Sequence, residues 1–87
     1  MRLLMLFSRE EINRTGYPAI VEGWDKRKSG RVRRAYLETF SEEERNTLTR
    51  IYPKLYRWYL VTGVEEAVLS GKTYELITKA ANFFATI

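Results

Sequence analysis

Residues 41–60 constrain the fold most, because they combine a strong helix start with a continuous apolar stripe. Ser41 and Glu44 have the spacing of a capping box, in which each side chain accepts a hydrogen bond from the other residue's backbone N–H. Downstream, apolar side chains recur every three or four residues, as one face of a helix requires: Leu48, Ile51, Tyr52, Leu55, Trp58 and Tyr59. We therefore predict a helix from residue 42 to about residue 62.

Pro53 lies inside this predicted helix. A proline removes one backbone hydrogen bond and crowds the preceding turn, which kinks or ends a helix. Pro53 falls beside Arg50, Lys54 and Arg57 on the polar face, where the freed carbonyl meets water. We predict one helix kinked at Pro53; the alternative is two helices, with Pro53 at the first position of the second.

The last quarter of the chain predicts a second long helix. Gly63 is expected to end the preceding helix, and residues 64–69 are expected to form a short helical turn before a break at Ser70-Gly71. A final helix over residues 73–86 follows from helix-spaced apolar side chains: Ile77, Ala80, Ala81, Phe84 and Ile87. We expect this apolar C-terminus to dock into the core; the alternative is a partner surface.

The first half gives weaker signals. Ser8 and Glu11 form a second capping box, which predicts a short helix over residues 9–15 after an extended segment at residues 1–7. Residues 19–36 fit either a β-hairpin, with the cations of residues 25–30 (DKRKSG) at its tip, or further helix. We expect a mainly α, single domain over residues 1–87 with three to four helices, or an α+β variant if the hairpin forms.

The chain of 87 residues contains no His and no Cys. Disulfides, Cys/His zinc sites and every Ser-His or Cys-His catalytic pair are therefore excluded. Arg34, Glu38 and Tyr74 are residue types that histidine-free ribonucleases of the toxin kind use, but those enzymes are built on a sheet, which a helical second half does not suit. We expect no enzymatic activity, no cofactor and no metal site.

Positive charge is concentrated in one segment. Residues 26–34 read KRKSGRVRR, with six cations and no acid, whereas the whole chain has a net charge of only +4. The remainder is therefore slightly acidic, and the basicity is local, as a binding surface requires. The cations of this basic segment are Lys26, Arg27, Lys28, Arg31, Arg33 and Arg34.

This basic segment predicts binding to a polyanion: DNA, RNA or a ribonucleoprotein surface. Each cation can neutralise a phosphate, and Trp24 and Tyr36 nearby can stack on exposed bases. The alternatives are an acidic protein partner and a solvated loop, with Trp24 and Tyr36 in the core. No known nucleic-acid motif is present: Tyr59, Glu65 and Glu66 argue against a helix-turn-helix around Gly63. Contacts with phosphates are therefore expected to outweigh base reading.

Gly71-Lys72-Thr73 resembles the end of a phosphate-binding loop. Such a loop also needs a Gly five residues before Gly71, at position 66, and this residue is Glu. A carboxylate at that position would repel phosphate. We interpret these residues as the break before the last helix, with Thr73 as its cap.

A protein partner is the alternative function. Tyr56, Arg57 and Trp58 form an aromatic and basic group of the kind found in interface hot spots. In this alternative the chain binds and blocks another protein, as compact accessory proteins of phages and other mobile elements do, anti-CRISPR inhibitors among them. The aromatic surface or the apolar C-terminus would also suit a homodimer. We expect a cytoplasmic protein, since no signal peptide or membrane span is visible.

Overall fold

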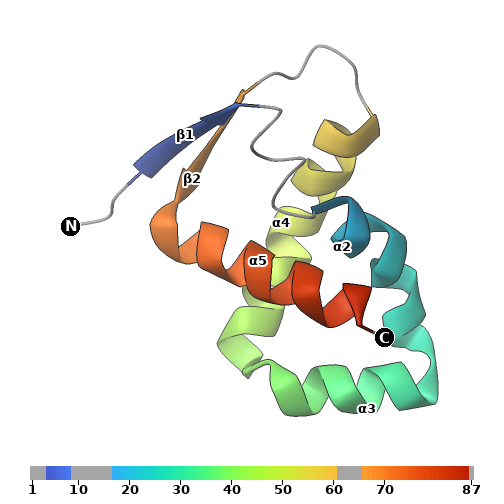
Figure 1. Ribbon diagram of the computed structural model, residues 1–87. Coiled ribbons are helices and arrows are strands. Elements are labelled where there is room, and N and C mark those ends of the chain that lie inside the picture. Colours follow the sequence, from blue (N-terminus) through green and yellow to red (C-terminus); the bar gives the residue numbers. More distant parts are fainter. Residues whose placement is uncertain (1–3, 9–16, 61–65, 87) are drawn as a thin grey trace.

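Helices make up most of residues 4–8, 17–60 and 66–86, which are the residues that the computed structural model describes. At one end lies a two-stranded antiparallel sheet of β1 (Leu4–Ser8) and β2 (Glu66–Ser70) (Figure 1). Its register sets Leu6 opposite Val68. The mainly helical fold class is thus confirmed, and none of the described helices is both long and apolar enough to cross a membrane.

Residues 19–36 are helical, so the predicted β-hairpin is wrong. They belong to α2 (Tyr17–Gly23), the 3₁₀ helix η1 (Trp24–Lys28) and α3 (Gly30–Thr39). Ser29 is the N-cap of α3, and its hydroxyl accepts a hydrogen bond from the Val32 N–H at 3.4 Å. Ser-Gly is a turn signal in a hairpin and also a good helix start, and in this chain it starts a helix.

The longest helix, α4 (Glu42–Leu60), begins where the capping box predicts and continues through Pro53. The Ser41 N–H donates to Glu44 Oε1 at 3.0 Å, and the Glu44 N–H donates to Ser41 Oγ at 3.2 Å. The alternative of two helices is therefore wrong. Pro53 is exposed, so the carbonyl that it leaves unpaired is on the solvent side of the helix.

The last helix, α5 (Gly71–Ala85), begins two residues earlier than predicted. Its N-cap is Ser70 instead of Thr73, and the Thr73 N–H donates to Ser70 Oγ at 3.1 Å. The predicted helical turn at residues 64–69 is also wrong, because residues 66–70 form β2. The predicted helix over residues 9–15 and the stop at Gly63 lie outside the described residues.

The core forms where α2 packs against α5 and α4. Gly23 makes this packing close: a Cβ at this position would lie 2.6 to 2.7 Å from side-chain atoms of Phe84. Ala80, Ala81 and Phe84 are at most 4% exposed, so the predicted docking of the apolar C-terminus is confirmed for these side chains. Burial of these apolar groups is what holds the helices together.

Candidate nucleic-acid interface

The basic segment occupies η1 and the beginning of α3, at the end of the molecule away from the sheet (Figure 1). Five of its six cations are exposed, and we call these five the cationic surface: Lys26, Lys28, Arg31, Arg33 and Arg34. Asp25 lies 3.7 Å from Lys28, but both side chains are largely exposed, so this ion pair contributes little. Among the described residues, the other four cations have no ion-pair partner.

The three arginines of α3 are exposed and spread widely around the helix. Val32 and Tyr36 are buried and define the side of α3 that faces the core. With about 100° of rotation per residue, Arg34 lies on the opposite side, and Arg31 and Arg33 lie on either side of it. Arg31 and Arg33 are therefore about 160° apart around the helix, and the three cations do not form a single row.

Arg27 is the exception among the six cations. Its guanidinium carbon lies 4.2 Å from the centre of the Trp24 ring, and its Nε is buried with no hydrogen-bond partner. A cation in contact with an aromatic face is attracted by the ring electrons. Arg27 thus packs over the core and helps to fix η1 to it.

Trp24 and Tyr36 are core residues, only 5% and 6% exposed. The Trp24 ring stacks on Tyr52 at 4.6 Å with 12° between the planes, and Tyr36 packs at 5.1 Å from Phe40. The structure thus places both residues in the core, as the alternative interpretation expected, and leaves neither ring free to stack on a base. Burial raises the pKa of Tyr36, against the opposing effect of nearby Arg27 and Arg45.

The structure describes two of the three side chains in the aromatic and basic group predicted as a protein interface. Tyr56 is 44% exposed on α4, and Arg57 beside it is exposed as well. The side chain of Trp58 lies outside the described residues. Of the described large apolar side chains, Leu37 on α3 is the other exposed one, at 48%.

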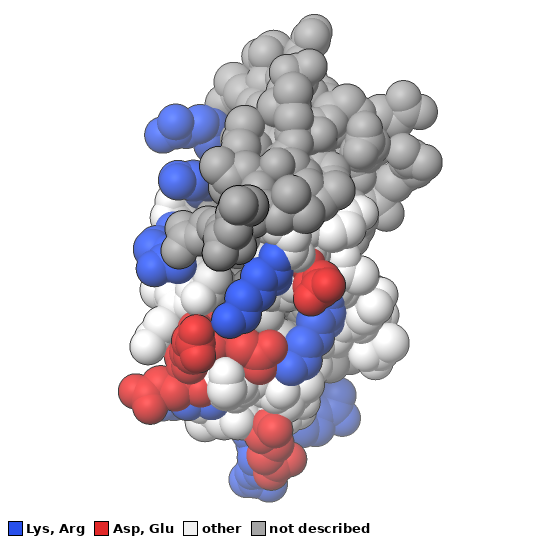
Figure 2. Space-filling view, turned by 90° about the vertical axis from the view of Figure 1, so that its left-hand side faces the viewer, with Lys and Arg blue, Asp and Glu red and all other residues white. Residues whose placement is uncertain are grey.

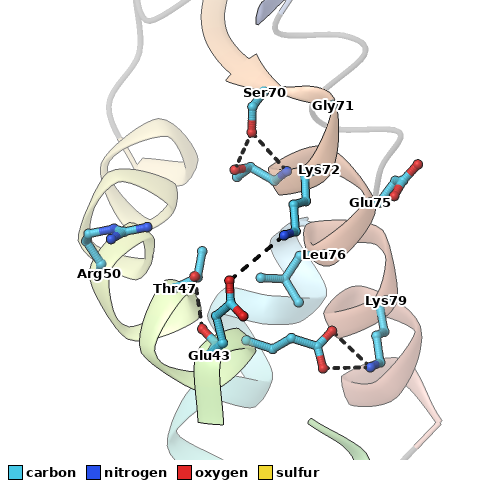
Figure 3. A pocket seen from close by; sticks show the side chains of 11 residues that line it. Glu43, Thr47, Arg50, Ser70, Gly71, Lys72, Glu75, Leu76 and Lys79 are labelled. Carbon is cyan, nitrogen blue, oxygen red and sulfur yellow. Dashed lines mark hydrogen bonds and ion pairs between the residues drawn. The ribbon is translucent and has the colours of Figure 1, made fainter. Parts of the chain in front are cut away.

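A groove of about 910 Å³ lies between the first half of α4 and the start of α5. Acidic and basic side chains are interspersed on this side of the molecule (Figure 2). Glu43 and Thr47 line the groove from α4, and Lys72 and Lys79 from α5, with the Lys72 side chain directed toward Glu43 (Figure 3). The sequence did not reveal this groove, because the contact between α4 and α5 joins residues about 35 positions apart.

The charges of this groove are matched within the protein. Lys72 Nζ lies 3.9 Å from Glu43, and Lys79 Nζ donates to both Glu44 oxygens at 3.0 and 3.1 Å. The hydrogen bond from the Ser41 N–H, followed by that from Lys79, lowers the pKa of Glu44. Such a groove has little excess positive charge for a polyanion, in contrast with the cationic surface.

The described residues also offer no metal site, since no three acidic side chains are close enough to share an ion. Comparisons of the chain with protein-family models, curated proteins and solved structures find no match. The cationic surface is therefore the feature on which a function can be based.

Proposed function

We propose that this protein is a non-enzymatic module that binds the phosphate backbone of nucleic acid through the cationic surface. The observation that carries the proposal is the charge at the start of α3. Arg31, Arg33 and Arg34 are all exposed there, and no described acid pairs with any of them.

Arg31 and Arg33, in the first turn of α3, are unfavourable for the helix itself. The first turn of a helix carries partial positive charge, so acids stabilise it and cations oppose it, by about 0.3–1 kcal/mol each at low salt. The first turn of α3 contains no acid. A bound phosphate would be attracted both by the helix end and by the arginines, whose planar guanidinium groups suit bidentate contact with phosphate oxygens.

The scaffold fixes the backbone that carries these cations before any ligand binds. Trp24 at the start of η1 and Val32 and Tyr36 in α3 are buried on either side of the exposed residues. The backbone of the cationic surface is therefore ordered by the fold, and binding does not have to order it.

The test measures binding of a labelled mixed-sequence nucleic acid by fluorescence anisotropy at 50 and 200 mM salt. With about five phosphate contacts, affinity should fall roughly a few hundred-fold over this range. Combined Arg31→Ala, Arg33→Ala and Arg34→Ala should weaken binding. The affinity of this variant should fall only roughly tenfold between 50 and 200 mM salt.

The matched control combines Arg50→Ala, Lys54→Ala and Arg57→Ala. It removes the same charge from exposed positions on α4 and should leave binding nearly unchanged. Equal losses in both triple variants would mean that only net charge matters. No binding at low salt would reject the proposal.

The competing proposal is a protein partner bound through α4. It is favoured by the exposure of Tyr56 beside Arg57, because Tyr and Arg are frequent in interface hot spots. In that case Tyr56→Ala should weaken binding to the partner more than removal of the three α3 arginines. The two proposals therefore predict opposite rankings of the same variants.

A further inference from the structure

The aromatic residues closest in sequence to the cationic surface have no free ring face. Tyr17, Trp24 and Tyr36 are 1%, 5% and 6% exposed. The Trp24 ring is in contact with the Tyr52 ring, stacked at 4.6 Å, and with the Arg27 guanidinium, 4.2 Å from its centre. Proteins that bind single-stranded nucleic acid obtain much of their affinity from bases stacked on aromatic side chains. This source of affinity is missing from the described part of the surface.

The positions of the cations also suit contact with more than one row of phosphates. Arg31 and Arg33 lie on either side of Arg34 around α3, and Lys26 and Lys28 precede them on η1. A single strand presents one row of phosphates, whereas a duplex presents a row on each side of a groove. Cations on both sides of the helix midline can contact both rows.

From these observations, and on the basis of the proposed function, we propose that the cationic surface binds double-stranded nucleic acid in preference to single strands. Charge density favours the same choice. A duplex carries one phosphate charge per about 1.7 Å of its axis, compared with about 3.4 Å for each strand, and releases more counterions per contact. When stacking contributes nothing, the polyanion with the denser charge binds more tightly.

The test compares one labelled 20-nucleotide DNA as a single strand and as a duplex, with an unstructured sequence. The duplex should bind about tenfold more tightly at 100 mM salt, with a steeper salt dependence. Combined Arg31→Ala, Arg33→Ala and Arg34→Ala should reduce this preference. Equal or tighter binding of the single strand would overturn the inference while leaving the proposed function intact, whereas no binding of either form would reject both.

A second measurement tests the absence of stacking directly. The chain has two tryptophans, so Trp58→Phe leaves Trp24 as the sole source of tryptophan fluorescence. Saturating this variant with the single strand should leave its emission nearly unchanged, because the ring faces are already occupied. Strong quenching would mean that a base stacks on Trp24 and would overturn the inference. Thermal unfolding followed by circular dichroism establishes that each variant is folded.

Discussion

The helices α3 and α5 begin in the same way but differ in what surrounds their starts. Residues 29–31 read Ser-Gly-Arg and residues 70–72 read Ser-Gly-Lys. The two N-caps share nearly the same backbone geometry, with φ of −71° in both and ψ of 149° and 151°. Each serine hydroxyl accepts a hydrogen bond from the residue three positions later, Val32 at 3.4 Å and Thr73 at 3.1 Å.

The two helix starts differ in whether an acidic side chain lies near the basic residue. Lys72 in α5 lies 3.9 Å from Glu43 in the acidic first turn of α4, but both side chains are largely exposed, so this ion pair is weak. Arg31 in α3 has no described acidic partner and is followed by two more arginines. The acid beside Lys72 offsets its charge only in part, whereas the start of α3 has no such acid among the described residues. The fold alone does not account for the excess charge on α3, which supports a role in binding.

Reversing the charge at Arg31 and at the equivalent Lys72 should produce the largest difference between α3 and α5 in stability and in binding. Arg31→Glu replaces an unfavourable cation by an acid, so the free energy of unfolding should rise by about 0.3–1 kcal/mol. The same change should weaken nucleic-acid binding about tenfold or more, because it replaces attraction to phosphate by repulsion. Urea unfolding and fluorescence anisotropy measure the two effects.

Lys72→Glu is the matched control for this reversal. It makes the same charge change at the same helix position, but it places a second carboxylate near Glu43. We expect no gain in stability and little change in binding. If both variants gained stability and lost affinity equally, the comparison between α3 and α5 would fail.

Replacing each of the three N-cap serines by Ala should lower stability by an amount that follows the length of its hydrogen bond. Ser41→Ala and Ser70→Ala should each lower the free energy of unfolding by about 1 kcal/mol. Ser29→Ala should cost less, because its hydrogen bond to the Val32 N–H is the longest of the three, at 3.4 Å. The measurement is urea unfolding of each variant; a larger loss for Ser29 would contradict this ranking.

The smallest expected effect is a dependence of stability on acidic pH that comes from Glu44 in α4. The Ser41 N–H and Lys79 stabilise the ionised form of Glu44, so its pKa is lower in the folded than in the unfolded protein. This contribution to stability is present above the ordinary pKa of a glutamate, near 4.5, and is lost as pH falls through the lower folded value.

Comparing Glu44→Gln with the parent protein by urea unfolding at pH 7 and pH 3 measures this contribution. The variant should be less stable at pH 7, and the difference should shrink at pH 3. A difference that stays constant with pH would mean that Glu44 acts through packing alone.

Local patterns in the sequence predict the long helices well, because caps and apolar stripes involve neighbouring residues. The capping box at Ser41 and Glu44 gave the start of α4, and the periodic apolar residues gave α5. The strand β2 was mistaken for a helical turn because its pairing partner, β1, is about sixty residues away. A short apolar segment carries no local sign of such a distant partner.

The candidate site could also be predicted from the sequence only in part. The six cations are evident from composition, but the position of each depends on residues distant in sequence. Tyr52 of α4 and Phe84 of α5 complete the packing around Trp24, and Trp24 in turn holds Arg27. Sequence reasoning could therefore identify the basic segment, but it could not separate the five exposed cations from the one that packs on the core.

The close approach of α2 and α5 has an evolutionary consequence. Gly23 has an ordinary helical backbone, with φ of −87°, so no unusual conformation requires glycine there. What requires it is the Phe84 side chain, whose atoms lie within 2.7 Å of where a Cβ would be. In relatives of this chain, positions 23 and 84 should therefore vary together, with a larger residue at 23 only where 84 has become smaller. This constraint comes from packing alone and does not depend on the charges of the basic segment.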